Sequence, residues 1–319
     1  MLTSPPRTDV ESEAAPDDRR RTRRRVTLGV FVAIALVAGT IGRGAVSEGF
    51  ADGFLSDLLP WLDGTTVTLY FGDGADERLV PVSRVLNGDD ESPDGLVAAF
   101  LGGPAAGTGL VQLVPAGTIL RSLAVDGGVV SVELTGGQGD WTPLAREALV
   151  RSLTSWPEIA EARIVVDGIL LEDDPGHLLY FYDQDRDMLV TESIDGETGR
   201  DVLDAYLAGP RDDRLTGLPP DVAVLGFSSA PGGGLLRINL TYSPSVRAFA
   251  AADGDALRRV LEGLIATMTT GPSNTEFVYL DFEGHDTLGL GQCASLLRRA
   301  VPKPAVLNDE RLIEPLPEM

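Results

Sequence analysis

Leu69-Tyr70-Phe71 returns as Leu179-Tyr180-Phe181, and Leu101-Gly102-Gly103-Pro104 returns as Leu207-Ala208-Gly209-Pro210. Between these two signals the spacing is kept, since Phe100 has the counterpart Tyr206. A repeat of about one hundred residues is too long for a solenoid unit and close to the size of an independent domain. The chain therefore carries two copies of one domain, which we place at residues 65–170 and 177–287.

Each copy has the pattern strand, strand, helix, strand, strand, helix, strand. In the first copy, an acidic turn separates two strand-like runs, and Ser92-Pro93 begins a helix. In the second copy, apolar residues recur at helical spacing from Leu257 to Met268. Hairpins that alternate with single helices predict an α+β fold. We expect two tandem mixed-sheet domains (ββαββαβ), each with its two helices on one face of the sheet.

The two copies differ in the length of their loops. The first has extra residues near Asn87 and Asp90, and the second has extra residues near Ser243 and Ala250. Function usually diverges in loops, so these four residues mark candidate partner-binding loops. After the second copy, residues 288–319 predict a short terminal helix followed by a proline-rich tail.

The N-terminus has the features of a membrane anchor. Six arginines between Arg19 and Arg25 stand directly before an uncharged run that ends at Gly42. That run is at the short end of the roughly 17 to 25 residues that span a bilayer, and its arginine flank belongs in the cytoplasm. We expect a disordered cytoplasmic tail (1–25), a transmembrane signal anchor (26–42), a spacer (43–64) and an extracytoplasmic body, in a single-pass protein of the cell membrane. A long cleaved signal peptide is the alternative.

Composition excludes several kinds of site. The formal net charge of −22 opposes nucleic-acid binding by counterion release. The single cysteine, Cys293, excludes an intramolecular disulfide and a cysteine-rich zinc site, and it is expected to pack as a small apolar residue. Two histidines, His177 and His285, leave little material for imidazole chemistry. We expect no metal, no cofactor and no nucleic-acid partner.

The order of the repeated motifs resembles the GerMN domain, the sporulation and spore germination module of cell-envelope proteins. The positions that carry this resemblance in the first copy are Tyr70, Phe71, Arg84, Gly103, Pro104, Pro115, Gly117, Asp167 and Gly168. Those in the second copy are Tyr180, Phe181, Gly209 and Pro210. The second copy departs from the pattern, because Pro219-Pro220-Asp221-Val222 replaces the proline–glycine turn and no arginine matches Arg84.

The resemblance implies a binding or scaffolding role. Proteins with this pattern are exported or membrane-anchored and have no established active site, and their fold is similar to ring-building modules of secretion-like channels. The motif positions are then structural. The implied partners are an envelope protein or peptidoglycan, in a sporulation, germination or envelope-signalling role, with self-association as a further expectation and the cytoplasmic membrane bound through residues 26–42.

Two motifs could bind a metal or act as a nucleophile instead. The run at 183–187 alternates carboxylates as a calcium loop does, but Met188 stands where such a loop needs glycine. This favours a solvated turn. His285-Asp286 could activate Ser295, but the first copy has Ile169-Leu170 at the matching place, which favours a surface histidine.

The alternative function is a peptidoglycan-modifying hydrolase that uses carboxylates between the repeats. Glu133 and Asp167 are candidates for an acid pair, which hydrolyses glycans when its carboxyl groups lie about 5 to 10 Å apart. However, Glu133 becomes Asn239 in the second copy. Because the candidate chemical groups do not recur while the apolar faces do, the duplication preserved a fold, and we expect that the protein is not an enzyme.

Overall fold

The computed structural model describes residues 64–313 apart from 75, 138–140, 172–175, 197, 231–232, 272–274 and 284–289. Both repeats belong to one compact unit, residues 61–319. The predicted cytoplasmic tail, signal anchor and nearly all of the spacer lie outside the described residues. Within the described part of the chain, no helix has the length and apolar character that a membrane span requires.

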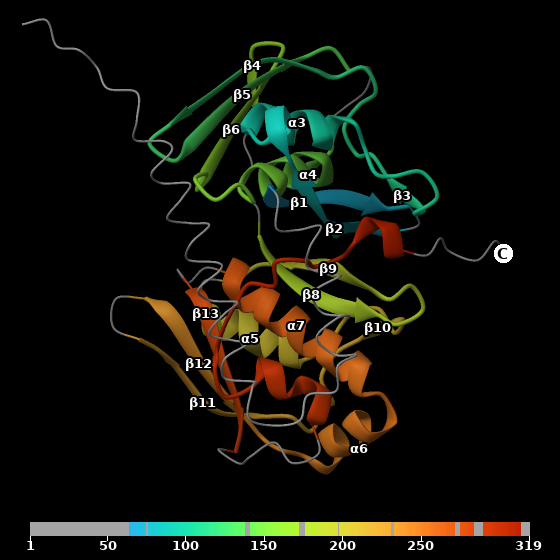
Figure 1. The fold of residues 1–319 in the computed structure, drawn as a ribbon, viewed down its shortest axis with the longest axis vertical. Coiled ribbons are helices and arrows are strands. Elements are labelled where there is room, and N and C mark those ends of the chain that lie inside the picture. The colour runs from blue at the N-terminus through green and yellow to red at the C-terminus, as the bar shows by residue number, and fades with distance from the viewer. Residues whose placement is uncertain are drawn as a thin grey trace, which may run out of the picture. The chain divides into compact units, whose positions relative to one another are not determined.

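The first repeat follows the predicted order, with the short strands β3 and β7 and one 3-10 turn added (Figure 1). Its elements are β1 (Thr65–Asp73), β2 (Asp76–Leu86), η2 (Gly88–Asp90), α3 (Pro93–Leu101), β3 (Leu110–Val111), β4 (Ile119–Asp126), β5 (Val129–Thr135), α4 (Pro143–Leu153), β6 (Glu161–Val166) and β7 (Ile169–Leu171).

The second repeat has the same order of main strands and helices with one extra helix, and its described residues contain no counterpart of η2 or β7. Its elements are β8 (His177–Asp183), β9 (Met188–Ile194), α5 (Gly199–Leu207), β10 (Leu215–Thr216), β11 (Val224–Ser229), β12 (Gly234–Leu240), α6 (Pro244–Ala252), α7 (Gly254–Thr270) and β13 (Thr275–Phe282). The extra helix α6 occupies the place of the predicted partner loop. Ser243 caps its N-terminus and Ala250 lies within it, so the prediction of a loop there is wrong.

Each repeat contains two sheets, with its helices between them. The first has the sheets β2-β1-β3 and β4-β5-β6-β7. The second has β10-β8-β9 and β11-β12-β13-β14, where β14 (Ala300–Pro302) comes from the chain after the repeat. Helix α4 contacts both β1 and β6, and α7 contacts both β8 and β13 (Figure 1). The α+β class and the tandem repeat are confirmed. The prediction of helices on one face of a single mixed sheet is wrong.

The three-stranded inner sheets are buried on both faces, unlike the four-stranded outer sheets. Every residue of β1 from Val67 to Asp73 is buried, and so is every residue of β8 after His177. In β5, by contrast, only alternate residues are fully buried. A strand buried on both faces is an uninterrupted apolar run rather than an alternating one. One face of β1 packs on the helices, and the other faces the second repeat.

Helix ends form where capping residues stand. The side chains of Ser92 and Thr142 accept hydrogen bonds from backbone N–H groups at the starts of α3 and α4, where a proline follows each cap. Gly103 and Gly209 have φ values of +80° and +88° just beyond α3 and α5. This left-handed conformation favours glycine, and the prolines that follow cannot continue a helix.

Helices α4 and α7 also close the free edges of the inner sheets. The Tyr70 N–H donates to Ser152 Oγ (3.0 Å), and the Tyr180 N–H donates to Thr267 Oγ1 (2.9 Å). Contact is close in the second repeat, where a Cβ on Gly263 would lie 2.3 Å from the Tyr180 carbonyl oxygen. Both helices therefore satisfy strand N–H groups that would otherwise be buried without a partner.

The chain after the second repeat does not form the predicted terminal helix. It forms a 3-10 turn, η3 (Gly291–Leu296), and then β14 (Ala300–Pro302), which pairs antiparallel with β13. Cys293 in this turn is buried, as expected, and burial raises the pKa of its thiol to about 11. The following segment returns to the first repeat and ends in a second 3-10 turn, η4 (Glu310–Leu312).

Candidate binding site between the two repeats

The Tyr-Phe motif of each repeat has two separate tasks. Phe71 stacks on Phe100, and Phe181 stacks on Tyr206, so the phenylalanines anchor the first helix of each repeat. The tyrosines point the other way. The hydroxyls of Tyr70 and Tyr180 lie 2.6 Å apart between the repeats, and burial raises the pKa of both. Equivalent residues therefore meet where the inner sheets pack.

A buried ion pair forms a second link. Arg186 is 2% exposed and lies in the turn between β8 and β9, yet its guanidinium reaches Asp73 at the end of β1 (2.7 Å) and donates to the Thr108 carbonyl (3.0 Å). The prediction of a solvated turn is therefore wrong at its centre. The calcium hypothesis gains no support, because the described residues contain no cluster of side chains that could hold a metal ion.

Asn308 in the returning segment forms a third link. Its side-chain amide donates to the carbonyls of Pro81 (2.7 Å) and Leu189 (2.8 Å) and accepts from the Leu189 N–H (2.7 Å). Toward Leu189 the amide behaves as a strand peptide group would, with one donor and one acceptor. Its backbone carbonyl meanwhile accepts from the Ser83 N–H (2.9 Å). One residue thus bonds to the outer strands of both inner sheets.

The contacts of Arg84 show the structural role of the arginine in the first repeat's motif. Its guanidinium donates to the carbonyls of Ala99 and Gly103, at the end of α3, and forms a two-point ion pair with Glu310. Arginine near a helix C-terminus stabilises the unpaired carbonyls there. In the second repeat Ile194 takes the equivalent place.

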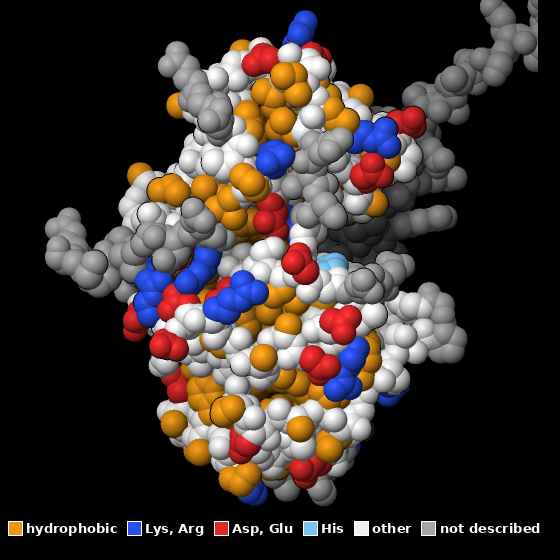
Figure 2. Space-filling model, turned by 180° about the vertical axis from the view of Figure 1, so that it is seen from behind, with side chains coloured by type: hydrophobic (Ala, Val, Ile, Leu, Met, Phe, Trp, Pro, Cys, Tyr) orange, Lys and Arg blue, Asp and Glu red, His pale blue; other side chains and the backbone are white. Residues whose placement is uncertain are grey.

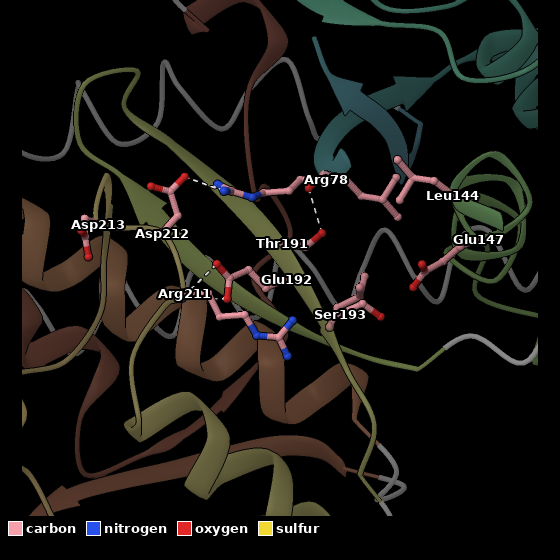
Figure 3. Close-up of a pocket in the computed structure, with 11 residues that line it drawn as sticks. Arg78, Leu144, Glu147, Thr191, Glu192, Ser193, Arg211, Asp212 and Asp213 are labelled. Atoms are coloured by element: carbon pink, nitrogen blue, oxygen red, sulfur yellow. Dashed lines mark hydrogen bonds and ion pairs between the residues drawn. The ribbon is translucent and has the colours of Figure 1, made fainter. Parts of the chain in front are cut away.

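A pocket of about 550 Å³ opens between the repeats (Figure 3). The first repeat contributes residues of β2 and α4, and the second contributes residues of β8, β9 and the loop before β10. The lining residues are Arg78, Leu79, Leu144, Glu147, Leu178, Thr191, Glu192, Ser193, Arg211, Asp212 and Asp213. The volume lies within the range of about 300 to 1,000 Å³ that ligand sites occupy.

Two of the lining carboxylates are held by fixed donors. Asp212 pairs with Arg214 (2.7 Å) and with Arg78 of the other repeat (2.5 Å). The hydrogen bonds from Arg214, and then that from Arg78, hold the pKa of Asp212 well below its usual range. Glu192 accepts the backbone N–H of Arg211 (3.1 Å) on the pocket wall. An ionised carboxylate fixed in this way suits binding, whereas a general acid needs a raised pKa.

The predicted acid pair lies elsewhere. Glu133 is on β5, where it forms an ion pair with Arg121. Asp167 has a φ of +48° in the turn between β6 and β7, and its carboxylate accepts from Thr135 Oγ1 (2.7 Å). Neither residue lines the pocket. Both stabilise the four-stranded sheet, so the catalytic carboxylates of a hydrolase would have to be other residues.

The remaining motif positions shape turns. Gly117 has a φ of +85° in a turn closed by the Thr118 N–H and hydroxyl, which both donate to the Pro115 carbonyl. Gly168 follows Asp167 with a φ of +82°, and two left-handed residues in succession make the tight turn typical of hairpins. These motif positions therefore set the backbone conformation of the turns.

The other predicted chemical and partner residues lie on the surface or outside the described residues. His177 begins β8 and is half-buried, while His285 and Asp286 lie outside the described residues. Asn87 and Asp90 are exposed at either end of η2. Acidic and basic side chains are interspersed on the face shown in Figure 2.

The family model for sporulation and spore germination, called Germane, matches residues 68–172 and again 178–287. Together these two matches cover more than half of the chain. The chain belongs to the sporulation and spore germination (Germane) family. No curated protein sequence matches it. The membership agrees with the resemblance to the GerMN domain that the repeated motifs indicated.

Two solved structures are similar to the chain. The tandem GerMN domains of the sporulation protein GerM from Bacillus subtilis are 17% identical, with a TM-score of 0.56, and the match covers 77% of this chain and 99% of that one. At this identity the likeness shows the tandem fold alone. A putative lipoprotein from Clostridium perfringens is 20% identical over 37% of this chain and 84% of its own, but its TM-score of 0.23 carries no argument.

Sequence reasoning missed the residues that join the repeats and line the pocket. Arg186 is the single basic residue in an acidic turn, which was the available signal for a buried partner. Asn308 stands in a segment without periodicity and offered no signal. Arg78, Glu192 and Asp212 are distant in the sequence, and only the packing of one repeat on the other brings them together.

Proposed function

We propose that this protein is a membrane-anchored, non-catalytic binding module of the bacterial cell envelope, which holds an envelope protein or peptidoglycan in the pocket between its repeats. The pocket supports this proposal most directly, because both repeats line it and two of its carboxylates are already held by fixed donors. Family membership supports an envelope role of the sporulation or germination type.

The competing proposal is a peptidoglycan-modifying hydrolase. One observation favours it, since four carboxylates line the pocket between the repeats, at Glu147, Glu192, Asp212 and Asp213. Incubation of the full chain, in detergent micelles, with purified peptidoglycan separates the two. The binding proposal expects sedimentation with the polymer or with a partner protein and no soluble product. Released muropeptides would overturn it.

Topology is the second part of the proposal. The arginine cluster before residues 26–42 supports a single-pass protein whose body lies outside the cytoplasm. A reporter that is active only after export, fused after Thr135, should be active in cells. A reporter active only in the cytoplasm, fused at the same place, should be silent, and its activity would contradict the export argument.

A further inference from the structure

The pocket contains part of a strand edge whose counterpart in the first repeat is occupied. In the inner sheets β2-β1-β3 and β10-β8-β9, the outer strands are β2 and β9. Ser83 in β2 lies opposite Thr68, and Ser193 in β9 lies opposite Leu178. The two serines are equivalent by the internal repeat. Ser193 is exposed and lines the pocket.

The peptide group of Ser193 points away from β8. Leu189 bonds through its N–H and C=O to the amide of Asn308, so its peptide groups face outward from the β8–β9 pair. Outward and inward residues alternate along an antiparallel strand, which places Ser193, four residues further on, in the same outward set. Within the described residues, Ser193 has no hydrogen bond outside the strand pair.

The first repeat shows what this kind of edge binds. The Ser83 N–H donates to the Asn308 carbonyl (2.9 Å), and Ser83 Oγ accepts from the Leu307 N–H (2.9 Å). Ser83 and Asp309 form a parallel β-bridge. The chain's own extended segment is therefore seated on the edge of β2 at the serine.

We propose that the edge of β9 at Ser193 binds an extended peptide segment with basic side chains, supplied by a partner protein, as the edge of β2 at Ser83 binds residues 307–309. This inference rests on the proposed function and names its partner chemistry. Strand addition to an exposed edge is a common mode of peptide recognition: backbone hydrogen bonds give affinity, and side-chain contacts give specificity.

The charges around the pocket favour basic side chains on the bound peptide. Beside Ser83, Arg84 binds the acidic Glu310 of the seated segment. Beside Ser193, the equivalent position is Ile194. Of the pocket carboxylates, Glu147 pairs with Arg151, and Asp212 pairs with Arg78 and Arg214, which leaves Glu192 and Asp213 to attract a ligand cation. Asp213 is exposed at this pocket. An acidic segment would meet like charge here, whereas lysine or arginine would be attracted and its aliphatic stem could cover Leu144.

A pair of peptides tests the proposal with the full chain in detergent micelles. The probe has the sequence of residues 305–312 with arginine in place of Asp309 and Glu310, and the matched control keeps the natural sequence. We expect the basic peptide to bind at least about tenfold more tightly by fluorescence anisotropy, the ratio for two ordinary charge contacts. Equal affinity, or tighter binding of the acidic peptide, would overturn the proposal.

Variants locate the site. Ser193→Pro removes the outward N–H and should abolish binding. Ser193→Ala keeps that N–H but lacks the hydroxyl that corresponds to the acceptor Ser83 Oγ, so it should weaken binding only several-fold. Proline is compatible with such a position, since Pro81 is in the outward set of β2. Asp213→Asn should weaken binding several-fold, and Asp126→Asn, on an exposed turn of the first repeat, should not.

A measurement on the unmodified chain covers the case in which Ser193→Pro fails to fold. The basic peptide should slow hydrogen exchange at the Ser193 amide, because strand addition gives that N–H a partner. Peptide binding without protection there would place the ligand elsewhere and overturn the proposal. Peptidoglycan sedimentation is independent of these results, so failure of this inference and failure of the proposed function are distinguishable.

Discussion

The buried pair Arg186–Asp73 should couple the stability of one repeat to that of the other. Both side chains are almost fully buried, at 2% and 6% exposure, and their atoms lie 2.7 Å apart. Replacing one partner leaves the other charge buried without compensation, which costs about 3 to 5 kcal/mol. Arg186→Met also removes the donor to the Thr108 carbonyl. We expect Arg186→Met and Asp73→Leu each to lower the free energy of unfolding by about 3 to 5 kcal/mol.

The double variant should recover most of that loss. It lacks both charges of the pair, and its remaining defects are the unpaired Thr108 carbonyl, which costs about 1 to 3 kcal/mol, and the lost attraction between Arg186 and Asp183. Urea titration of the full chain in detergent micelles, followed by tryptophan fluorescence, measures all four proteins in one double-mutant cycle. If the two losses simply add in the double variant, Arg186 and Asp73 do not act as a pair and this reasoning is refuted.

Three further predictions concern other links and the acidic face of the pocket. Asn308→Ala leaves both peptide groups of Leu189 and the Pro81 carbonyl without a partner, and should lower the free energy of unfolding by about 3 kcal/mol in the same titration. Folding lowers the pKa of Asp212, so the stabilisation by its ionised carboxylate is present at neutral pH and is lost as the pH falls below the ordinary carboxyl range. The difference in the free energy of unfolding between the wild type and Asp212→Asn should therefore shrink in acid. A difference that stays constant with pH would contradict this. Cys293, with a pKa raised to about 11, should resist a thiol reagent at pH 8 until urea unfolds the chain, and rapid labelling of the folded protein would contradict its burial.

Local structure was predictable where a residue caps a helix or fixes the backbone conformation of its own turn. Ser92-Pro93 and Thr142-Pro143 mark helix starts because a capping oxygen and a fixed φ act within one turn. Gly103 and Gly209 mark helix ends for the same local reason. The repeat itself fixed the number of domains, because equivalent apolar positions must fill equivalent cores.

The second sheet of each repeat and the pocket were not predictable in the same way. Both depend on which faces of the repeats meet, and a face buried by a neighbouring domain looks, in sequence, like one buried by the domain's own helices. The uninterrupted apolar run in β8 was a usable signal, since it implies cover on both sides. Arg186 was the other signal, as a lone cation among aspartates.

We expect the pocket between the repeats to bind an envelope component without transforming it. A photo-crosslinking amino acid at position 213, in the pocket, and another at position 126, on the exposed β4–β5 turn, test it in living cells. We expect an adduct with a protein or with peptidoglycan from position 213 and none from position 126. Adducts only from position 126 would contradict it.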